Sequence, residues 1–170
     1  PMKIRRIGAV LLALAMLLPT VALAKTIVVD AADYEISKDG WYDGMEEVAM
    51  YLTFFDKLPG NYITKREAQN LGWDNRKGNL WSVAEGCSIG GDRFGNYEGI
   101  LPDQKGRKWT ECDIDFDGGY RNGKRVVFSN DGLIYYTGDH YQTFDEVEVI
   151  WTDKDDSFLS SITVTCSYYG

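Results

Sequence analysis

The sequence predicts an α+β fold, in which N-terminal helices pack on a C-terminal antiparallel β-sheet. The first observation is that apolar residues recur at helical spacing before about residue 85 and alternate with polar residues after it. The second is that glycine-containing turns separate the later segments, as in an antiparallel meander. The chain has 170 residues, which suits one folded domain behind an N-terminal targeting segment.

Three helices are expected in the first half of the chain. Apolar residues at helical spacing predict the first over about residues 44–56. Thr64 and Glu67 form a capping box at the start of the second, which should end at Leu71. A third, short helix is expected over residues 79–84.

Strands are expected in the second half. Within the segment 108–116, alternation places Cys112 on the aliphatic face and Glu111 on the opposite face. Residues 125–128 and 133–136 should form the next hairpin.

The flanks and the tryptophans give weaker signals. Residues 26–29 are either an extra strand or part of a pro-segment, and residues 146–151 alternate like a strand. Trp73, Trp81 and Trp109 are predicted to belong to the core.

The N-terminus has the pattern of a cleaved secretory signal over residues 1–24. Lys3, Arg5 and Arg6 precede an apolar run, and small residues end at Ala24. We expect a secreted protein whose mature form does not contact the membrane, because no apolar run reaches the roughly 20 residues of a membrane helix. The remaining chain is divided into an acidic leader or pro-segment (25–40), a folded domain (41–147) and a C-terminal extension of unknown role (148–170).

Charge is distributed unevenly along the chain. Without residues 1–24 there are 15 basic residues against 26 acidic ones, a net charge of −11, whereas residues 57–144 carry 12 of each. A protein this acidic is a poor general binder of nucleic acid. Contact with RNA or DNA would have to come from a local cluster of cations.

Three cysteines in an exported chain suggest one disulfide and one free thiol. We favour the pairing of Cys87 with Cys112, because both lie in or next to segments expected to be strands of one sheet. That cross-link would stabilise the fold by about 3–4 kcal/mol, and Cys166 would be left unpaired.

The residues that could carry chemistry are few. The sequence has no CxxC, HExxH, P-loop or GxSxG motif, and one histidine leaves few ways to build a transition-metal site, so no metal or other cofactor is expected. His140 can exchange protons near neutral pH. Together with Glu111 and the cations Lys65, Arg121 and Arg125, it suits phosphoryl chemistry, with a carboxylate base, an imidazolium acid and fixed positive charge.

Several motifs, in this order and spacing, resemble the barnase-like family of microbial guanyl-specific ribonucleases. They are LPGNYITKREAQNLGW (58–73), KGNL (77–80), SIGGD (88–92), GRKW (106–109) and DHYQTF (139–144). The likeness runs from about Trp41 to Phe144. It implies the microbial ribonuclease fold for the domain 41–147. It also implies cleavage of single-stranded RNA 3′ of guanosine, first to a 2′,3′-cyclic phosphate and then by hydrolysis.

The resemblance also implies catalytic roles. Glu111 matches the base that takes the proton from the ribose 2′-hydroxyl, and His140 matches the acid that protonates the leaving 5′-oxygen. Arg121 and Arg125 match two arginines on the scissile phosphate. Lys65 matches a lysine that stabilises the charged transition state.

A guanine site is implied at Phe94, Asn96, Tyr97 and Glu98. Backbone N–H groups of this loop would donate to the guanine base, and the Glu98 carboxylate would accept hydrogen bonds from the N–H groups of guanine. Tyr141 would contact the substrate.

Two positions in the guanine loop depart from barnase, which has an arginine where Tyr97 stands and a serine where Gly95 stands. Fungal members carry a tyrosine that packs on the base. Aromatic stacking is worth about 1–3 kcal/mol per base, so guanine binding could be kept while one positive charge is lost.

Three alternatives remain open. Arg121 and Arg125 could merely pair with Asp113 or Asp115 as exposed ion pairs of small value. The fold could bind RNA or an acidic inhibitor without turnover. The enzyme, expected to be a monomer, could also be an exported antibacterial toxin with a barstar-like immunity partner.

Overall fold

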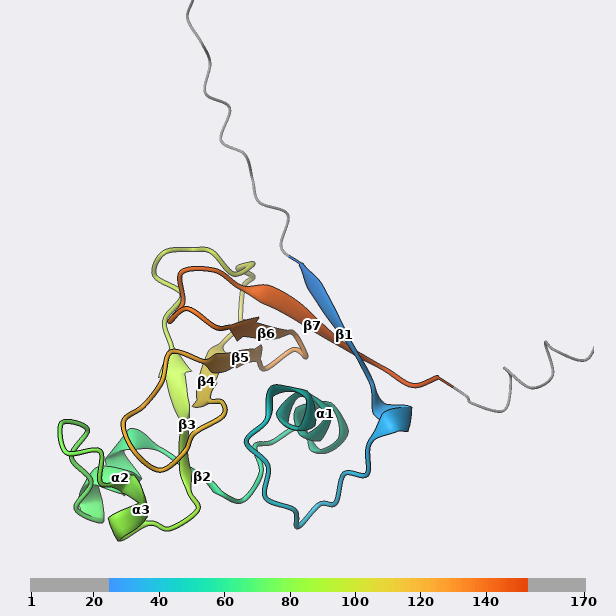
Figure 1. The fold of residues 1–170 in the computed structure, drawn as a ribbon. Helices are drawn as coiled ribbons and strands as arrows, with labels where there is room; N and C mark the ends of the chain where they lie inside the picture. Colours follow the sequence, from blue (N-terminus) through green and yellow to red (C-terminus); the bar gives the residue numbers. More distant parts are fainter. Residues whose placement is uncertain (1–24, 153–170) are drawn as a thin grey trace, which may run out of the picture.

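The computed structural model describes residues 25–152 (Figure 1), and these contain helices and one seven-stranded sheet, as an α+β protein does. The elements are β1 (Thr26–Asp30), a 3-10 turn (Ala31–Asp33), α1 (Met45–Phe55), β2 (Tyr62–Ile63), α2 (Lys65–Asn70), α3 (Leu80–Val83), β3 (Ser88–Phe94), β4 (Trp109–Asp113), β5 (Arg125–Ser129), β6 (Ile134–Thr137) and β7 (Asp145–Ile150). Across the sheet the order is β1-β7-β6-β5-β4-β3-β2.

The three predicted helices are present, close to their predicted bounds. Helix α1 ends at Phe55 and is capped by Asp56, which takes a left-handed conformation with φ of 52°. At the start of α2 the Thr64 side chain accepts from the Glu67 backbone N–H, and the Glu67 carboxylate accepts from the Thr64 backbone N–H. This reciprocal pair is the predicted capping box. Helix α3 is one short turn.

The sheet is mixed, which the sequence did not predict. Strands β3 to β7 are antiparallel to one another, as expected for consecutive hairpins. At the two edges, however, β2 runs parallel to β3 and β1 runs parallel to β7. Parallel neighbours need long connections, and here those connections contain the helices, so no local hairpin signal marks them.

Helix α1 shares a core with the sheet. Its buried residues Val48, Ala49 and Leu52 form one cluster with Cys112, Val126 and Ile134 from the strands. Helices α2 and α3 lie at the other end of the molecule, near β2 and β3 (Figure 1), where Ala68 and Leu80 pack with Ile89 and Phe116.

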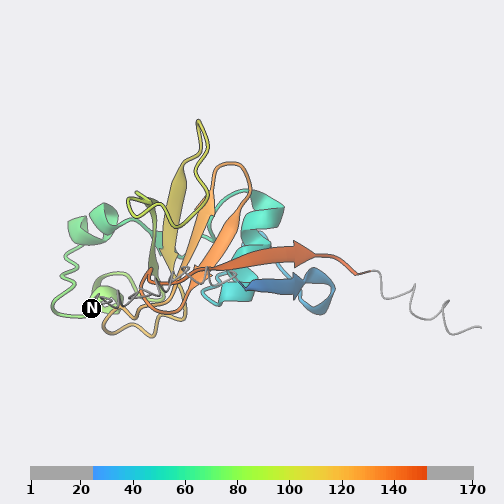
Figure 2. The same cartoon turned by 90° about the horizontal axis from the view of Figure 1, so that it is seen from above.

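The N-terminal flank forms a strand. Of the two alternatives for residues 26–29, the structure has the strand, and Val29 is buried in the α1 core. Figure 2 shows β1 and β7 side by side, and the Thr152 backbone N–H donates to the Asp30 carboxylate at 3.1 Å. The predicted signal peptide and residues 153–170 lie outside the described residues, so the proposed division into domains stays a prediction.

The prediction of a disulfide between Cys87 and Cys112 is wrong, since both thiols are free. Cys112 pairs across the sheet with Gly90, three residues beyond Cys87. A strand advances about 3.3 Å per residue, so the two cysteines lie about 10 Å apart along the sheet, beyond the reach of a disulfide. Burial raises the pKa of Cys112 far above its usual range. Cys166 lies outside the described residues.

Two of the three tryptophans are core residues as predicted, and one is not. Trp73 and Trp109 are buried, but Trp81 is 40% exposed. One edge of Trp81 packs against Phe116, and its indole N–H donates to the Cys87 carbonyl at 2.9 Å. No helix among residues 25–152 combines the length and apolarity needed to cross a bilayer.

Candidate active site

A cleft of about 680 Å³ gathers the predicted site residues. Every residue predicted for catalysis or substrate binding lines this cleft except Arg125, which is fully buried. They come from α2, β3 and the loop after it, β4, the loop before β5 and the turn after β6. Arg93, Ile100 and Gln142 also line the cleft, although the sequence did not single them out.

Strand β4 sets the catalytic face by simple alternation. Cys112 points into the α1 core, so Glu111 and Asp113 share the opposite face. Glu111 is only 7% exposed. The predicted placement of Glu111 opposite the aliphatic face is confirmed.

Both carboxylate oxygens of Glu111 accept a hydrogen bond. Lys65, at the first turn of α2, donates from Nζ to Oε1 at 2.7 Å. The Tyr141 hydroxyl donates to Oε2 at 2.6 Å. Burial and this hydrogen bond hold the pKa of Tyr141 well above its usual range, so the hydroxyl stays protonated and keeps its role as donor. The Glu111 side chain is therefore fixed in one position before any substrate binds.

Asp113 holds the two arginines. Arg121 donates to its two oxygens from Nε and Nη2, each at 2.6 Å, and Arg125 Nε lies 2.9 Å from Oδ1. Burial would lower the pKa of Arg121, but the ion pair with Asp113 outweighs it and the pKa is raised.

The sequence left open that Arg121 and Arg125 form exposed ion pairs with Asp113 or Asp115. They do pair with Asp113, but the pairs are buried and not exposed. Asp113 is 1% exposed and Arg125 is 2% exposed, so the cluster belongs to the class of buried ion pairs, which are costly to break. The sequence contained only part of the signal for this cluster, because alternation places Asp113 on the same face as Glu111, whereas its position directly opposite Arg125 follows from the strand register.

The turn that carries His140 has a strained backbone and is held in place by hydrogen bonds to Asp139. His140 and Tyr141 have φ of 57° and 72°, a left-handed conformation uncommon for residues other than glycine. The Asp139 carboxylate accepts from the Thr143 hydroxyl at 2.6 Å and from the backbone N–H groups of Gln142 and Thr143 at 3.0 and 2.9 Å. These bonds, those with Thr143 first, lower the pKa of Asp139 from 3.8 to about 2.

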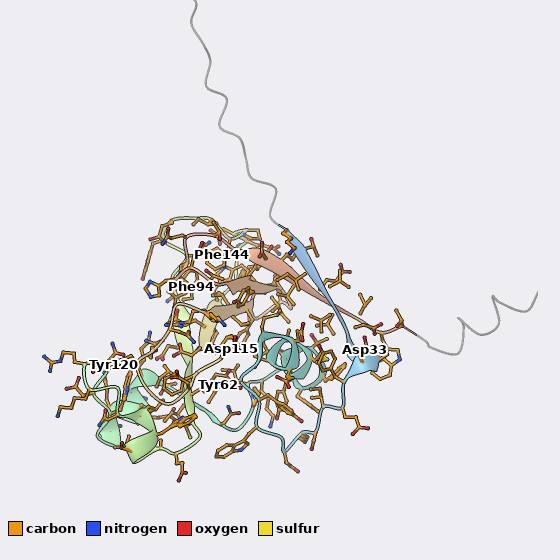
Figure 3. All side chains as sticks on the ribbon, viewed as in Figure 1. Asp33, Tyr62, Phe94, Asp115, Tyr120 and Phe144 are labelled. Atoms are coloured by element: carbon orange, nitrogen blue, oxygen red, sulfur yellow. The ribbon has the colours of Figure 1, made fainter. Side chains whose placement is uncertain are left out.

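Further contacts connect this turn to the rest of the cleft. The His140 backbone N–H donates to the carbonyl of Gly123 at 3.0 Å, which fixes the turn to the loop after Arg121. The imidazole is exposed, and its centroid lies 4.8 Å from that of the Tyr141 ring. Tyr141 in turn stacks on Phe94, with ring centroids 5.2 Å apart, so one aromatic side chain touches the proposed acid, the proposed base and the base-binding loop. Phe94 also packs against Phe144, with ring centroids 6.0 Å apart (Figure 3).

The loop after β3 is shaped by Asn96. Its amide nitrogen donates to the Leu101 carbonyl at 2.9 Å, and its amide oxygen accepts from the Leu101 N–H at 3.0 Å. The Asn96 side chain therefore closes the loop and is not free to bind a base. Tyr97 is 94% exposed, and its ring lies over Gly95, where an added Cβ would be 2.2 Å from it. The absence of a side chain at Gly95 makes that ring position possible.

Among the described residues, no cluster of three or more histidine, cysteine or acidic side chains is arranged to hold a metal ion. What the cleft combines is a fixed carboxylate, an exposed imidazole and several cations.

Comparisons with known proteins agree on one family. Residues 46–148 match a family model described as ribonuclease. A ribonuclease of Bacillus intermedius is 54% identical over 106 residues, which are 62% of this chain and 64% of that protein. A ribonuclease of Heyndrickxia coagulans is 55% identical over 103 residues, 61% of this chain and 92% of that protein.

The crystal structure of ribonuclease Sa2 with guanosine-2′-cyclophosphate shares 34% identity over 33% of this chain and 60% of that one, with a TM-score of 0.30. The chain spans 64% of the length of the Bacillus relative. The family match covers well over half of the chain and includes Lys65, Glu111 and His140. The chain belongs to the ribonuclease family, in its barnase-like microbial branch.

Proposed function

We propose that this protein is an endoribonuclease that cleaves single-stranded RNA 3′ of guanosine without a metal ion. The observation that carries the proposal is that one cleft brings together Glu111, His140, Lys65 and Arg121, which come from four separate segments. A cleft in which a few polar and titratable side chains converge is the usual candidate for a binding or active site.

In the first step, Glu111 takes the proton from the ribose 2′-hydroxyl, and the 2′-oxygen attacks phosphorus. The bond from phosphorus to the 5′-oxygen breaks, and His140 gives its proton to that oxygen as it leaves. The product is a 2′,3′-cyclic phosphate. In the second step the roles reverse: His140 takes a proton from water, the water oxygen attacks phosphorus, and Glu111 protonates the departing 2′-oxygen.

Fixed positive charge lowers the energy of the phosphorane-like transition state. Lys65 and Arg121 line the cleft and can face the phosphate oxygens. Arg125 is buried, and its charge lies close enough to oppose the rise in the pKa of the Tyr141 hydroxyl. We therefore assign Arg125 a supporting role, through Asp113 and Tyr141, in the free protein.

Guanine preference would come from the loop after β3. Asn96 gives the loop its shape, Glu98 is exposed and available as an acceptor, and the exposed ring of Tyr97 can stack on the base. Stacking of this kind is worth about 1–3 kcal/mol per base.

The test uses the four dinucleotides that differ in the first base, in excess chelator. The proposal predicts that guanylyl-uridine is cleaved much faster than the adenosine, cytidine and uridine analogues. Equal rates for adenosine and guanosine would contradict the assignment of the loop, and loss of all activity in chelator would contradict metal independence.

We also propose that the protein acts outside the cell as a monomer and that an acidic, barstar-like protein could inhibit it. The apolar run after Lys3, Arg5 and Arg6 supports export. The cations Lys65 and Arg121 in the cleft suit an acidic inhibitor.

A further inference from the structure

A second, smaller pocket adjoins the guanine loop. It has a volume of about 200 Å³ and shares Arg93 and the start of the loop with the main cleft. Lys108, Arg107 and Asp103 form the rest of its polar wall. It does not include Glu111, His140 or Tyr141, so it lies at the base-binding end of the site and away from the reacting atoms.

Two cations in this pocket have no partner among the described residues. Arg93 and Lys108 are both exposed, and neither side chain forms an ion pair or a hydrogen bond within residues 25–152. Arg107 differs, because its guanidinium is bonded to Asp131 at 2.7 Å and to the Pro102 carbonyl at 2.7 Å.

The acidic residue in the wall offsets only part of this charge. Asp103 uses one oxygen to accept from the Gln104 backbone N–H at 2.8 Å. Two unpaired cations therefore face one carboxylate, and the pocket keeps a net positive charge that favours an anion.

We propose that this pocket binds a backbone phosphate of the RNA that flanks the guanosine and is distinct from the scissile phosphate. The inference rests on the proposed function, since it takes RNA as the ligand. The pocket shares Phe94, Gly95 and Asn96 with the proposed guanine loop, so a nucleotide next to a bound guanosine is within reach of it. Arg93 lies on β3, which leads into that loop.

The experiment compares Arg93→Gln/Lys108→Gln with Lys105→Gln, which removes an exposed cation that lines neither cavity. The substrates are guanylyl-uridine, which contains only the scissile phosphate, and trinucleotides extended by one nucleotide on the 5′ or the 3′ side. We expect kcat/KM of the double variant to fall roughly tenfold more on one trinucleotide than on the dinucleotide. The salt dependence of that kcat/KM should weaken by about 0.7 in logarithmic slope per cation. Lys105→Gln should match the wild type on all three.

Equal losses on the dinucleotide and both trinucleotides would overturn the inference, and so would no loss on any of them. If the wild type cleaves no dinucleotide, the proposed function has failed. The phosphate-binding role of the pocket is then tested by measuring the affinity for uncleavable 2′-deoxy trinucleotides. Their affinity should then fall in the double variant and not in Lys105→Gln. Competition by inorganic phosphate alone, without any difference between substrates, would show a site for free anions and contradict the assignment to RNA.

Discussion

The two ends of the cleft are built in opposite ways. At the catalytic end, Glu111 is held by two hydrogen bonds, and Asp113 by two arginines. At the base-binding end, Tyr97 is 94% exposed, and Glu98 is exposed as well. Proton transfer needs catalytic groups held at fixed distances. A guanine base, in contrast, can be recognised by exposed side chains that become ordered when it binds. The departures from barnase, at Gly95 and Tyr97, fall at the adaptable end.

The largest effect is expected from the proposed acid and base. Glu111→Gln and His140→Gln keep the size of each side chain but remove the proton transfer, so kcat for guanylyl-uridine should fall about 100-fold to 10,000-fold. Single-turnover cleavage measures this. Full activity of either variant would remove that residue from the mechanism.

The buried carboxylate should dominate stability. Asp113→Asn leaves two cations without their buried partner, and we expect the free energy of unfolding to fall by about 3–5 kcal/mol. Asp115→Asn is the matched control, because Asp115 pairs with Lys124 at 2.6 Å and both side chains are roughly half exposed. Its loss should cost about 0–1 kcal/mol. Urea denaturation measures both, and equal losses would contradict the distinction.

At the adaptable end, Tyr97→Ala should weaken binding of a guanosine mononucleotide by about 1–3 kcal/mol through lost stacking. Because the side chain is exposed, the urea midpoint should not change. Tyr97→Phe keeps the ring and should bind like the wild type. An unchanged affinity in Tyr97→Ala would show that the ring does not stack on the base.

The smallest effect is expected on stability at acidic pH, through the carboxylate of Asp139. The pKa of Asp139 is lowered from 3.8 to about 2 in the folded protein, so the unfolded chain takes up this proton first as pH falls. The stability that Asp139 contributes is complete above about pH 5 and is lost as pH falls toward 2. Asp139→Asn should therefore show a shallower decrease in the urea midpoint between pH 5 and 2. The same slope in both proteins would exclude this role.

Much of the local structure could be predicted because its causes are local. The capping box depends on Thr64 and Glu67, which are three positions apart, and alternation along one strand places Glu111 opposite Cys112. Both features therefore depend only on residues that are close in the sequence. The chemistry of the site was predicted by resemblance, and the cleft brings the predicted side chains together, with the exception of Arg125.

What could not be predicted depends on register and burial. The parallel edge strands and the separation of Cys87 from Cys112 follow from which strand residues lie opposite each other, which a single sequence does not encode locally. The burial of Arg125 depends in the same way on its position opposite Asp113. Arg93 was missed because an arginine on a strand end has no distinguishing pattern.

The central claim is that Glu111 and His140 transfer the protons of an RNA cleavage. The most direct measurement follows the products of guanylyl-uridine over time, in excess chelator, with the wild type and His140→Gln. The mechanism predicts that the wild type first accumulates guanosine 2′,3′-cyclic phosphate and then converts it to the 3′-phosphate, and that the variant does neither at a comparable rate. A first product that carries a 5′-phosphate, or an unchanged time course in the variant, would contradict it.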